Sequence, residues 1–293
     1  MSEPVTALGS LLGLAGEDIS SRTDVAPVRS SYVLRDGAVL SYLTAGASSG
    51  PAVLLLHGST ETASSDWFER SDVGSQLALL GYFVVAPDCR GHGLSSSTRN
   101  AAGIVEYSFE QMAADGAELL RALGVPRAFV CGHSNGGTVA LCLTKSFPLQ
   151  VRGAVVLAGN AYVDDHVRTR VPLGMDADHV DSESPEWRDS MIALHDTVHG
   201  EGYWRELLAA TVAETISYPN WSATDLAWLD VPVLAVQGTD DSVNAPGSHA
   251  QTIAAWLPRG SLWLAEGRGH SVHRESSVEF VERITTFFAA AQS

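Results

Sequence analysis

Ser134 stands at the centre of a Gly-x-Ser-x-Gly pattern in residues 131–137, which read CGHSNGG. An apolar run precedes the pattern and an amphipathic segment follows it, so we predict a strand before the serine and a helix after it. This is the setting of a nucleophilic serine, because small flanking residues allow a tight turn that exposes the hydroxyl. The start of the helix then favours negative charge that develops beside it. We interpret Ser134 as a nucleophile; the alternative is a helix N-cap without chemistry.

A second copy of the pattern shows how little it means alone. Residues 46–50 read GASSG and fit it equally well, but they precede a predicted strand, and Pro51 follows them directly. We interpret this copy as a plain loop. The position after a predicted strand therefore selects Ser134.

A serine nucleophile needs a general base, and the base needs an acid that orients it. Candidates lie in two loops that follow predicted strands. One loop, residues 238–243, contains Asp240 and Asp241, and the other contains His270. Ligand sites of parallel sheets lie at the carboxyl ends of strands, where both loops begin. His273 is a rival base, but it lies one helical turn further on, and we expect it at the start of the last helix.

The elements that would position these residues alternate between short apolar runs and amphipathic segments. We predict buried strands at residues 52–56, 82–86, 128–131, 154–157, 232–236 and 262–264. We predict helices near residues 73–80, 109–123, 138–147, 250–256 and 276–290. This alternation is typical of a parallel sheet covered on both faces, which right-handed crossovers wind into a doubly wound layer. The predicted fold class is therefore α/β, with a mostly parallel sheet.

Two features interrupt this regular alternation. An Asp-Gly turn at residues 36–37 lies between apolar runs, which predicts a hairpin before the parallel strands. After Gly159 the chain becomes polar and rich in Trp, His and Asp, with helical stretches but no buried strand. We interpret this segment as a small helical lid inserted into one core. The predicted division is an N-terminal arm, a core in two segments and a lid: residues 1–30, 31–159 with 222–293, and 160–221.

The composition excludes several classes of function. The 293-residue chain has a formal net charge of −16, with 45% hydrophobic and 18% charged residues, which is ordinary for a globular protein. So acidic a surface repels phosphates and anionic headgroups, so we expect no nucleic-acid partner and no membrane partner. Lys145 is the only lysine and lies in a predicted helix, which argues against Schiff-base chemistry.

Cysteine usage and the N-terminal residues indicate a cytoplasmic location. Three cysteines are too few and too sparse for a disulfide framework. The first twenty or so residues lack the basic and apolar regions of a signal peptide, and no apolar run reaches membrane-spanning length.

One weak metal motif also occurs. His195 and His199 are spaced for one helical face, but the first is followed by Asp196 where a zinc protease has Glu, and a third ligand is not evident. We expect no metal and no cofactor.

Taken together, the chain resembles the α/β-hydrolase superfamily, specifically its esterase, lactonase and haloperoxidase-like branch, from about Tyr32 onward. In that family the acid usually lies three residues after a Gly at a strand end, which implies Asp241 in preference to Asp240. The catalytic His follows a Gly near the C-terminus, which implies His270. The resemblance therefore implies a triad of Ser134, Asp241 and His270.

Residues 57–59, which read HGS, resemble the oxyanion loop of the same family. The resemblance implies that the backbone N–H groups of Ser59 and Asn135 form an oxyanion hole. His133, Trp187 and Trp204 are candidate substrate-binding residues, since aromatic lid residues beside a nucleophile can form an apolar pocket. The alternative for the lid tryptophans, which we favour for most of the lid aromatics, is that they only attach the lid to the core. The alternative for His133 is that it only fills the turn beside the nucleophile.

The leading hypothesis is a serine hydrolase that cleaves a carboxylic ester or lactone of a small, largely neutral molecule through an acyl-enzyme. One alternative is a hydrolase of C–C bonds in ring-cleavage products. Those enzymes usually carry Asn before the nucleophile and Trp after the base, where this chain has His133 and Ser271. Another alternative is a binding protein or receptor without turnover. Substrate identity stays open, as does the choice between a monomer and a homodimer.

Overall fold

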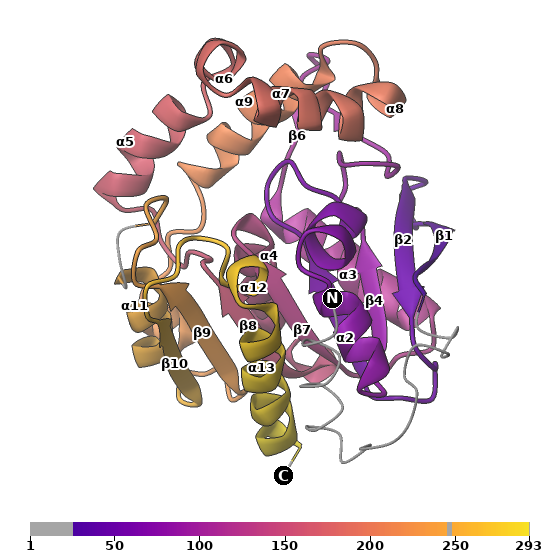
Figure 1. The fold of residues 1–293 in the computed structure, drawn as a ribbon, viewed down its shortest axis with the longest axis vertical. Coiled ribbons are helices and arrows are strands. Elements are labelled where there is room, and N and C mark those ends of the chain that lie inside the picture. The colour runs from indigo at the N-terminus through magenta and orange to yellow at the C-terminus, as the bar shows by residue number, and fades with distance from the viewer. Residues whose placement is uncertain (1–25, 245–247, 293) are drawn as a thin grey trace.

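The computed structural model describes residues 26–244 and 248–292, and its core is one eight-stranded sheet with helices on both faces (Figure 1). The strands run in the order β1-β2-β4-β3-β7-β8-β9-β10. β2 pairs antiparallel with β1 and β4, and all other pairs are parallel. In chain order their bounds are Val28–Val33 (β1), Val39–Ala45 (β2), Ala52–Leu56 (β3), Phe83–Pro87 (β4), Ala128–His133 (β7), Val151–Leu157 (β8), Val233–Gly238 (β9) and Gly260–Ala265 (β10). A short separate hairpin consists of β5, Thr98–Arg99, and β6, Val105–Glu106.

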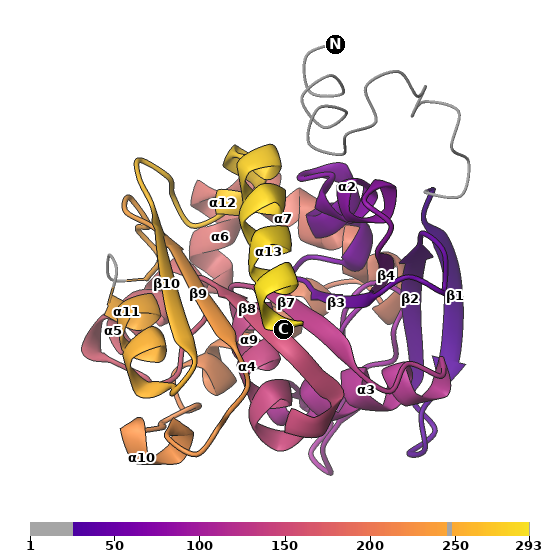
Figure 2. The same ribbon diagram turned by 90° about the horizontal axis from the view of Figure 1, so that it is seen from below.

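Helices cover the two faces of the sheet as a doubly wound layer requires. α3, α4 and α11 pack on one face, and α2 and α13 pack on the other (Figure 2). The bounds are Val73–Leu79 (α2), Phe109–Ala122 (α3), Asn135–Ser146 (α4), Ser248–Trp256 (α11), Val272–Glu275 (α12) and Ser277–Ala291 (α13). A π-helical turn, η3, spans Ser65–Glu69, and a 3-10 turn, η4, spans Pro148–Gln150. The α/β class expected from the sequence is confirmed.

β3 shows why the central strands are apolar throughout. Leu54 and Leu56 pack on one face of the sheet, and Val53 and Leu55 pack on the other. All four side chains are fully buried. Successive strand residues point to opposite faces, so a strand covered on both sides needs apolar residues at every position.

Between β8 and β9 the chain forms a group of helices, of which α5 to α9 lie above one end of the sheet (Figure 1). The group consists of α5 (Asp165–Gly174), α6 (Ala177–Glu183), α7 (Pro185–Met191), the π-helical turn η5 (Ile192–Asp196), α8 (Thr197–His199), α9 (Tyr203–Thr215) and α10 (Ala223–Leu226). Asp164 and Asp176 cap α5 and α6 by accepting backbone N–H groups. We call the segment from α5 to α9 the lid. The lid contains a small apolar cluster of its own, which consists of Val180, Met191, Trp204 and Leu208.

The N-terminal boundary differs from the expected one. β1 begins at Val28, so its pairing with Thr44, Leu43 and Tyr42 of β2 includes residues expected in the arm. The segment Val28–Val33 has too few alternating apolar and polar residues for a strand to be recognised from the sequence without its partner strand. The rest of the expected arm, residues 1–25, lies outside the described residues. Among the described helices, none has the length and apolar character needed to cross a membrane. The three cysteines are free and buried.

His195 links the lid to the core. Its Nε2 lies 2.9 Å from the carbonyl oxygen of Thr60, and its Nδ1 lies 3.0 Å from the backbone N of Gly93. Nδ1 therefore accepts the Gly93 N–H, and Nε2–H donates to Thr60. The ring is fully buried, and burial lowers the pKa of His195 to about 4. Both ring nitrogens serve backbone groups, which accounts for this histidine without a metal.

His195 should make the protein less stable in mild acid. Its pKa is lower in the folded than in the unfolded chain, so its stabilising effect is present above about pH 6.5 and is lost as the pH falls toward 4. His195→Gln, which retains an N–H for Thr60 but does not titrate, should reduce the slope of unfolding free energy against pH in this range. The slope should fall by an amount that approaches the contribution of one proton, about 1.4 kcal/mol per pH unit. Urea unfolding between pH 7 and pH 4.5 measures it, and an unchanged slope would contradict the assignment.

Candidate active site

Ser134 lies in a tight turn between β7 and α4, with φ 55° and ψ −123°. This backbone conformation is strained for a residue other than glycine and occurs mostly at functional sites. The Ser134 side chain makes no helix-capping hydrogen bond. Its neighbours must be small: a Cβ on Gly132 would lie 2.0 Å from the carbonyl oxygen of Gly136, and a Cβ on Gly136 would lie 2.3 Å from that of Leu56. The Ser134 hydroxyl is therefore not used as a helix cap and is free to react.

Three side chains form a connected chain of hydrogen bonds at this turn. Ser134 Oγ lies 2.9 Å from His270 Nε2, and His270 Nδ1 lies 3.0 Å from each carboxylate oxygen of Asp241. The distances fit a nucleophile, a base that accepts its proton and an acid that orients the base. The structure thus brings together the three residues expected from the sequence.

The carboxylate of Asp241 is fully buried behind His270. Burial alone would raise the pKa of Asp241, but the hydrogen bond from His270 and the backbone N–H groups of Asn244 and Val243 outweigh it. The pKa therefore lies below its ordinary value, and Asp241 is ionised at neutral pH. Asp240, the alternative acid, is exposed and contacts the hydroxyl of Thr239.

The rival base His273 lies in α12, a separate short helix before the last helix, α13, at whose start it was expected. It is buried, and its Nε2 lies 2.8 Å from a carboxylate oxygen of Asp66. Only His270 contacts the serine hydroxyl among the described histidines.

The expected oxyanion donors belong to two different segments, the loop after β3 and the start of α4. Asn135 is the first residue of α4, where the backbone N–H has no acceptor within the helix. Its side chain is used elsewhere and donates to the hydroxyl of Thr215 at 3.1 Å. Ser59 follows β3 and lines the same cavity as Ser134. His57 holds that loop, because its Nε2 accepts the backbone N–H of Cys89 at 2.8 Å. The backbone N–H groups of Ser59 and Asn135 therefore remain the candidate oxyanion donors.

A cavity of about 790 Å³ opens between the core and the lid beside Ser134 and His270. Its volume is in the range of small-molecule sites. The lid contributes a largely apolar wall from α5 and the turn after it, and this wall includes Val171, Leu173 and Met175. These residues could not be identified from the sequence, because nothing in the pattern of α5 indicates which side of the helix faces a cavity.

The three expected substrate-binding residues lie in different places. His133 and Trp187 line the cavity, and Trp187 Nε1 also donates to the Thr60 hydroxyl at 3.0 Å. Trp204 does not line it, contrary to our expectation. Its side chain is buried in the lid cluster with Val180, Met191 and Leu208, because it lies on the inner side of α9. Trp204 therefore holds the lid together.

Comparison with known proteins agrees with this geometry. The family pattern of the alpha/beta hydrolase fold matches residues 51–215, which is more than half of the chain. An uncharacterized protein of Mycobacterium tuberculosis is 27% identical over 301 residues, which cover 90% of this chain and 82% of that protein. Rhodomycin D methylesterase from Streptomyces is 26% identical over 267 residues, which cover 75% of this chain and 85% of the enzyme.

Among solved structures, an esterase from Rhodococcus superposes with a TM-score of 0.69 at 26% identity. The match covers 90% of this chain and 99% of that esterase.

Proposed function

This chain belongs to the alpha/beta hydrolase fold family and is a hydrolase, and from that membership we propose that it cleaves a carboxylic ester or lactone of a small, largely neutral molecule. The observation that carries the proposal is the hydrogen-bonded series Ser134, His270 and Asp241 beside a cavity. The similar methylesterase and esterase support an ester substrate.

The proposed reaction begins with attack of Ser134 Oγ on the substrate carbonyl carbon. His270 Nε2 takes the hydroxyl proton, while Asp241 stabilises the imidazolium that forms. The backbone N–H groups of Ser59 and Asn135 stabilise the oxyanion, and each such donor contributes a few kcal/mol to transition-state binding. His270 then protonates the leaving alcohol, and a water molecule repeats the steps on the acyl-enzyme.

The cavity walls support a largely neutral substrate. Apolar side chains from the lid line the same cavity as Ser134, and Val243 lines it as well. Two acidic residues line the cavity: Glu61 is paired with Arg70 and Arg274, and Asp176 accepts backbone N–H groups at the start of α6. Arg170 lines the cavity as well. Burying an apolar part of the substrate against the apolar side chains favours binding by roughly 25 cal/mol for each Å² of apolar surface removed from water.

The wild-type protein should hydrolyse p-nitrophenyl acetate, butyrate or octanoate, and the trend with chain length should reflect the size of the cavity. A fluorophosphonate probe should label the tryptic peptide that contains Ser134, because the probe reacts with activated serines. Excess substrate should slow this labelling. Label on another serine, or the absence of both labelling and hydrolysis of esters and a γ-lactone, would overturn the proposal.

A further inference from the structure

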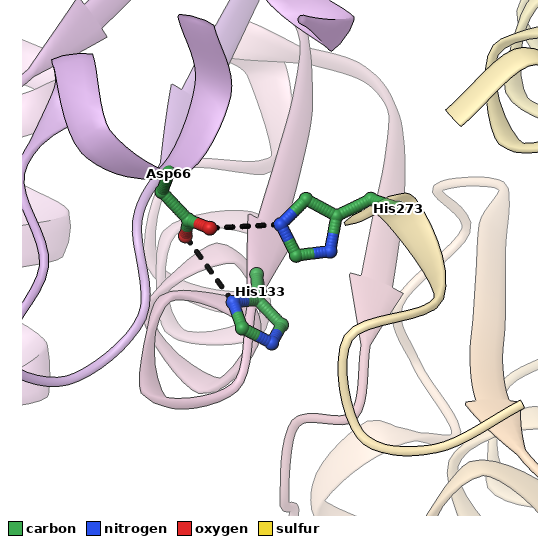
Figure 3. A group of neighbouring side chains, drawn as sticks. All are labelled: Asp66, His133 and His273. Atoms are coloured by element: carbon green, nitrogen blue, oxygen red, sulfur yellow. Dashed lines mark hydrogen bonds and ion pairs between the residues drawn. The ribbon is translucent and has the colours of Figure 1, made fainter. Parts of the chain in front are cut away.

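Asp66 is a fully buried carboxylate that faces two histidines, His133 and His273 (Figure 3). It belongs to η3 and accepts hydrogen bonds on both oxygens. Oδ2 accepts the backbone N–H of Gly58 at 2.9 Å and faces His133 Nδ1 at 3.2 Å. Oδ1 faces His273 Nε2 at 2.8 Å and accepts two hydrogen bonds from Arg274, at 2.6 and 3.1 Å.

These partners come from three separate segments, and each adjoins a residue of the proposed mechanism. Gly58 directly precedes Ser59, and His133 directly precedes Ser134. The third segment, residues 273–274, follows His270 after a single short turn. One carboxylate thus connects the segment of the oxyanion donor, the segment of the nucleophile and the segment of the base.

The protonation states of the group are consistent with this arrangement. Burial alone would raise the pKa of Asp66, but its interactions with His133 and His273 hold the pKa well below its usual range. Burial lowers the pKa of His133 to about 4 and also lowers that of His273. Both rings are therefore neutral at pH 7, and each donates its one ring N–H to Asp66. His133 Nε2 is then an acceptor, and the hydroxyl of Ser271 lies 3.4 Å away.

The same three side chains could also be read as a metal site. Their ligand atoms all lie within 4.8 Å of one another, and two histidines with a carboxylate are a common zinc set. In this arrangement, however, both facing nitrogens carry protons that they donate to Asp66. Oδ1 also holds the guanidinium of Arg274, whose charge opposes a bound cation. The geometry therefore favours a hydrogen-bonded network.

We propose that Asp66 is a positioning residue, which fixes the positions of the oxyanion donor, the nucleophile and the base relative to one another. The inference rests on the proposed function of these three segments. Asp66 itself does not line the cavity, so it acts through Gly58, His133 and the segment after His270. Misplacement of reacting groups by about 1 Å costs on the order of a hundredfold in rate. The loss of Asp66 should therefore lower kcat and leave KM nearly unchanged.

The variant Asp66→Asn should lower kcat for a p-nitrophenyl ester roughly 10- to 100-fold, with KM within about threefold of wild type. An amide can accept on one side only, so it cannot serve all the N–H groups that the carboxylate serves. Arg274 retains Glu61 as a partner at 3.0 Å, which limits the charge left unpaired. An unchanged kcat would overturn the proposal.

Asp115→Asn is the matched control. Asp115 is also a buried carboxylate, held by two hydrogen bonds from Arg90, but it lies in α3 away from the cavity. This variant should lose stability and retain kcat. An equal fall in kcat for both variants would show a general effect of losing a buried ion pair, and would overturn the specific role of Asp66.

A second variant and a second measurement keep the test independent of folding and of ester turnover. His273→Ala removes one donor and leaves Asp66 its bonds to Gly58 and Arg274, so it should lower kcat less than Asp66→Asn. Hydrogen exchange should increase together in residues 57–60, 132–136 and 266–274 of Asp66→Asn, and not in Asp115→Asn. This holds even if the wild type cleaves no ester, in which case only the proposed function fails. An increase in hydrogen exchange that is confined to η3 would overturn the positioning role. So would zinc that binds stoichiometrically to the wild type and is lost in Asp66→Asn.

Discussion

Ser134→Ala should abolish nearly all ester hydrolysis, with kcat lowered by up to roughly a millionfold. The substitution removes the oxygen that lies 2.9 Å from His270 Nε2 and leaves every other proposed group in place. Residual activity above the rate in water should come from substrate binding and the oxyanion donors alone. KM should change little, because the hydroxyl contributes little to ground-state binding. Stopped assays with p-nitrophenyl butyrate at high enzyme concentration measure the loss.

The chain supplies its own control for this substitution. Ser48 is the centre of the second Gly-x-Ser-x-Gly copy and is exposed in the loop before β3. Ser48→Ala should leave kcat and fluorophosphonate labelling unchanged. Activity that survives in Ser134→Ala would exclude the proposed acyl-enzyme. Since the two sites share one pattern, the pair of variants separates the pattern from its structural setting.

The fold could be predicted in its core, because the core is built from local patterns. Ala52–Leu56 is apolar at every position, and such a run bounded by turn residues is typical of a strand buried on both faces. The predicted ends of the strands were less accurate than the strands themselves. β8 begins at Val151, although Arg152 and Gly153 interrupt the apolar run, because pairing with β7 extends the strand. Partner strands decide such ends, and local sequence does not contain them.

The candidate site could be predicted where a residue's role depends on its place after a strand. Ser134, Asp241 and His270 follow β7, β9 and β10, and parallel strands bring such loops to the same edge. The lid could not be predicted in the same way. Trp187 and Trp204 are alike in the sequence, yet one lines the cavity and the other packs inside the lid. The difference arises from how α7 and α9 pack, which is a tertiary effect.

Asp66 shows the same limit within the core. It lies 67 residues before His133 and 207 before His273, and their hydrogen bonds depend on η3 packing against both β7 and α12. Nothing in the residues around Asp66 indicates a buried carboxylate, since an isolated Asp in a polar stretch is ordinarily exposed. Long-range polar networks of this kind become visible only once the chain is folded.

Asp241→Asn should lower kcat roughly 10⁴-fold, the loss expected when the orienting acid of a triad becomes an amide. The carboxylate accepts the N–H on His270 Nδ1, which leaves Nε2 free to take the proton of Ser134. An amide donates to Nδ1 instead and favours the tautomer with the proton on Nε2, which cannot act as a base toward the serine. KM should stay within a few-fold, because Asp241 does not line the cavity.

Asp240→Asn is the matched substitution one residue earlier, and it decides between the two acids that the sequence left open. Asp240 is exposed and its carboxylate contacts only the hydroxyl of Thr239 among the described residues, so this variant should retain wild-type kcat. A large loss in Asp240→Asn together with normal turnover in Asp241→Asn would reassign the acid and would require the loop after β9 to move. Equal activity in both variants and the wild type would mean that His270 acts without an orienting carboxylate.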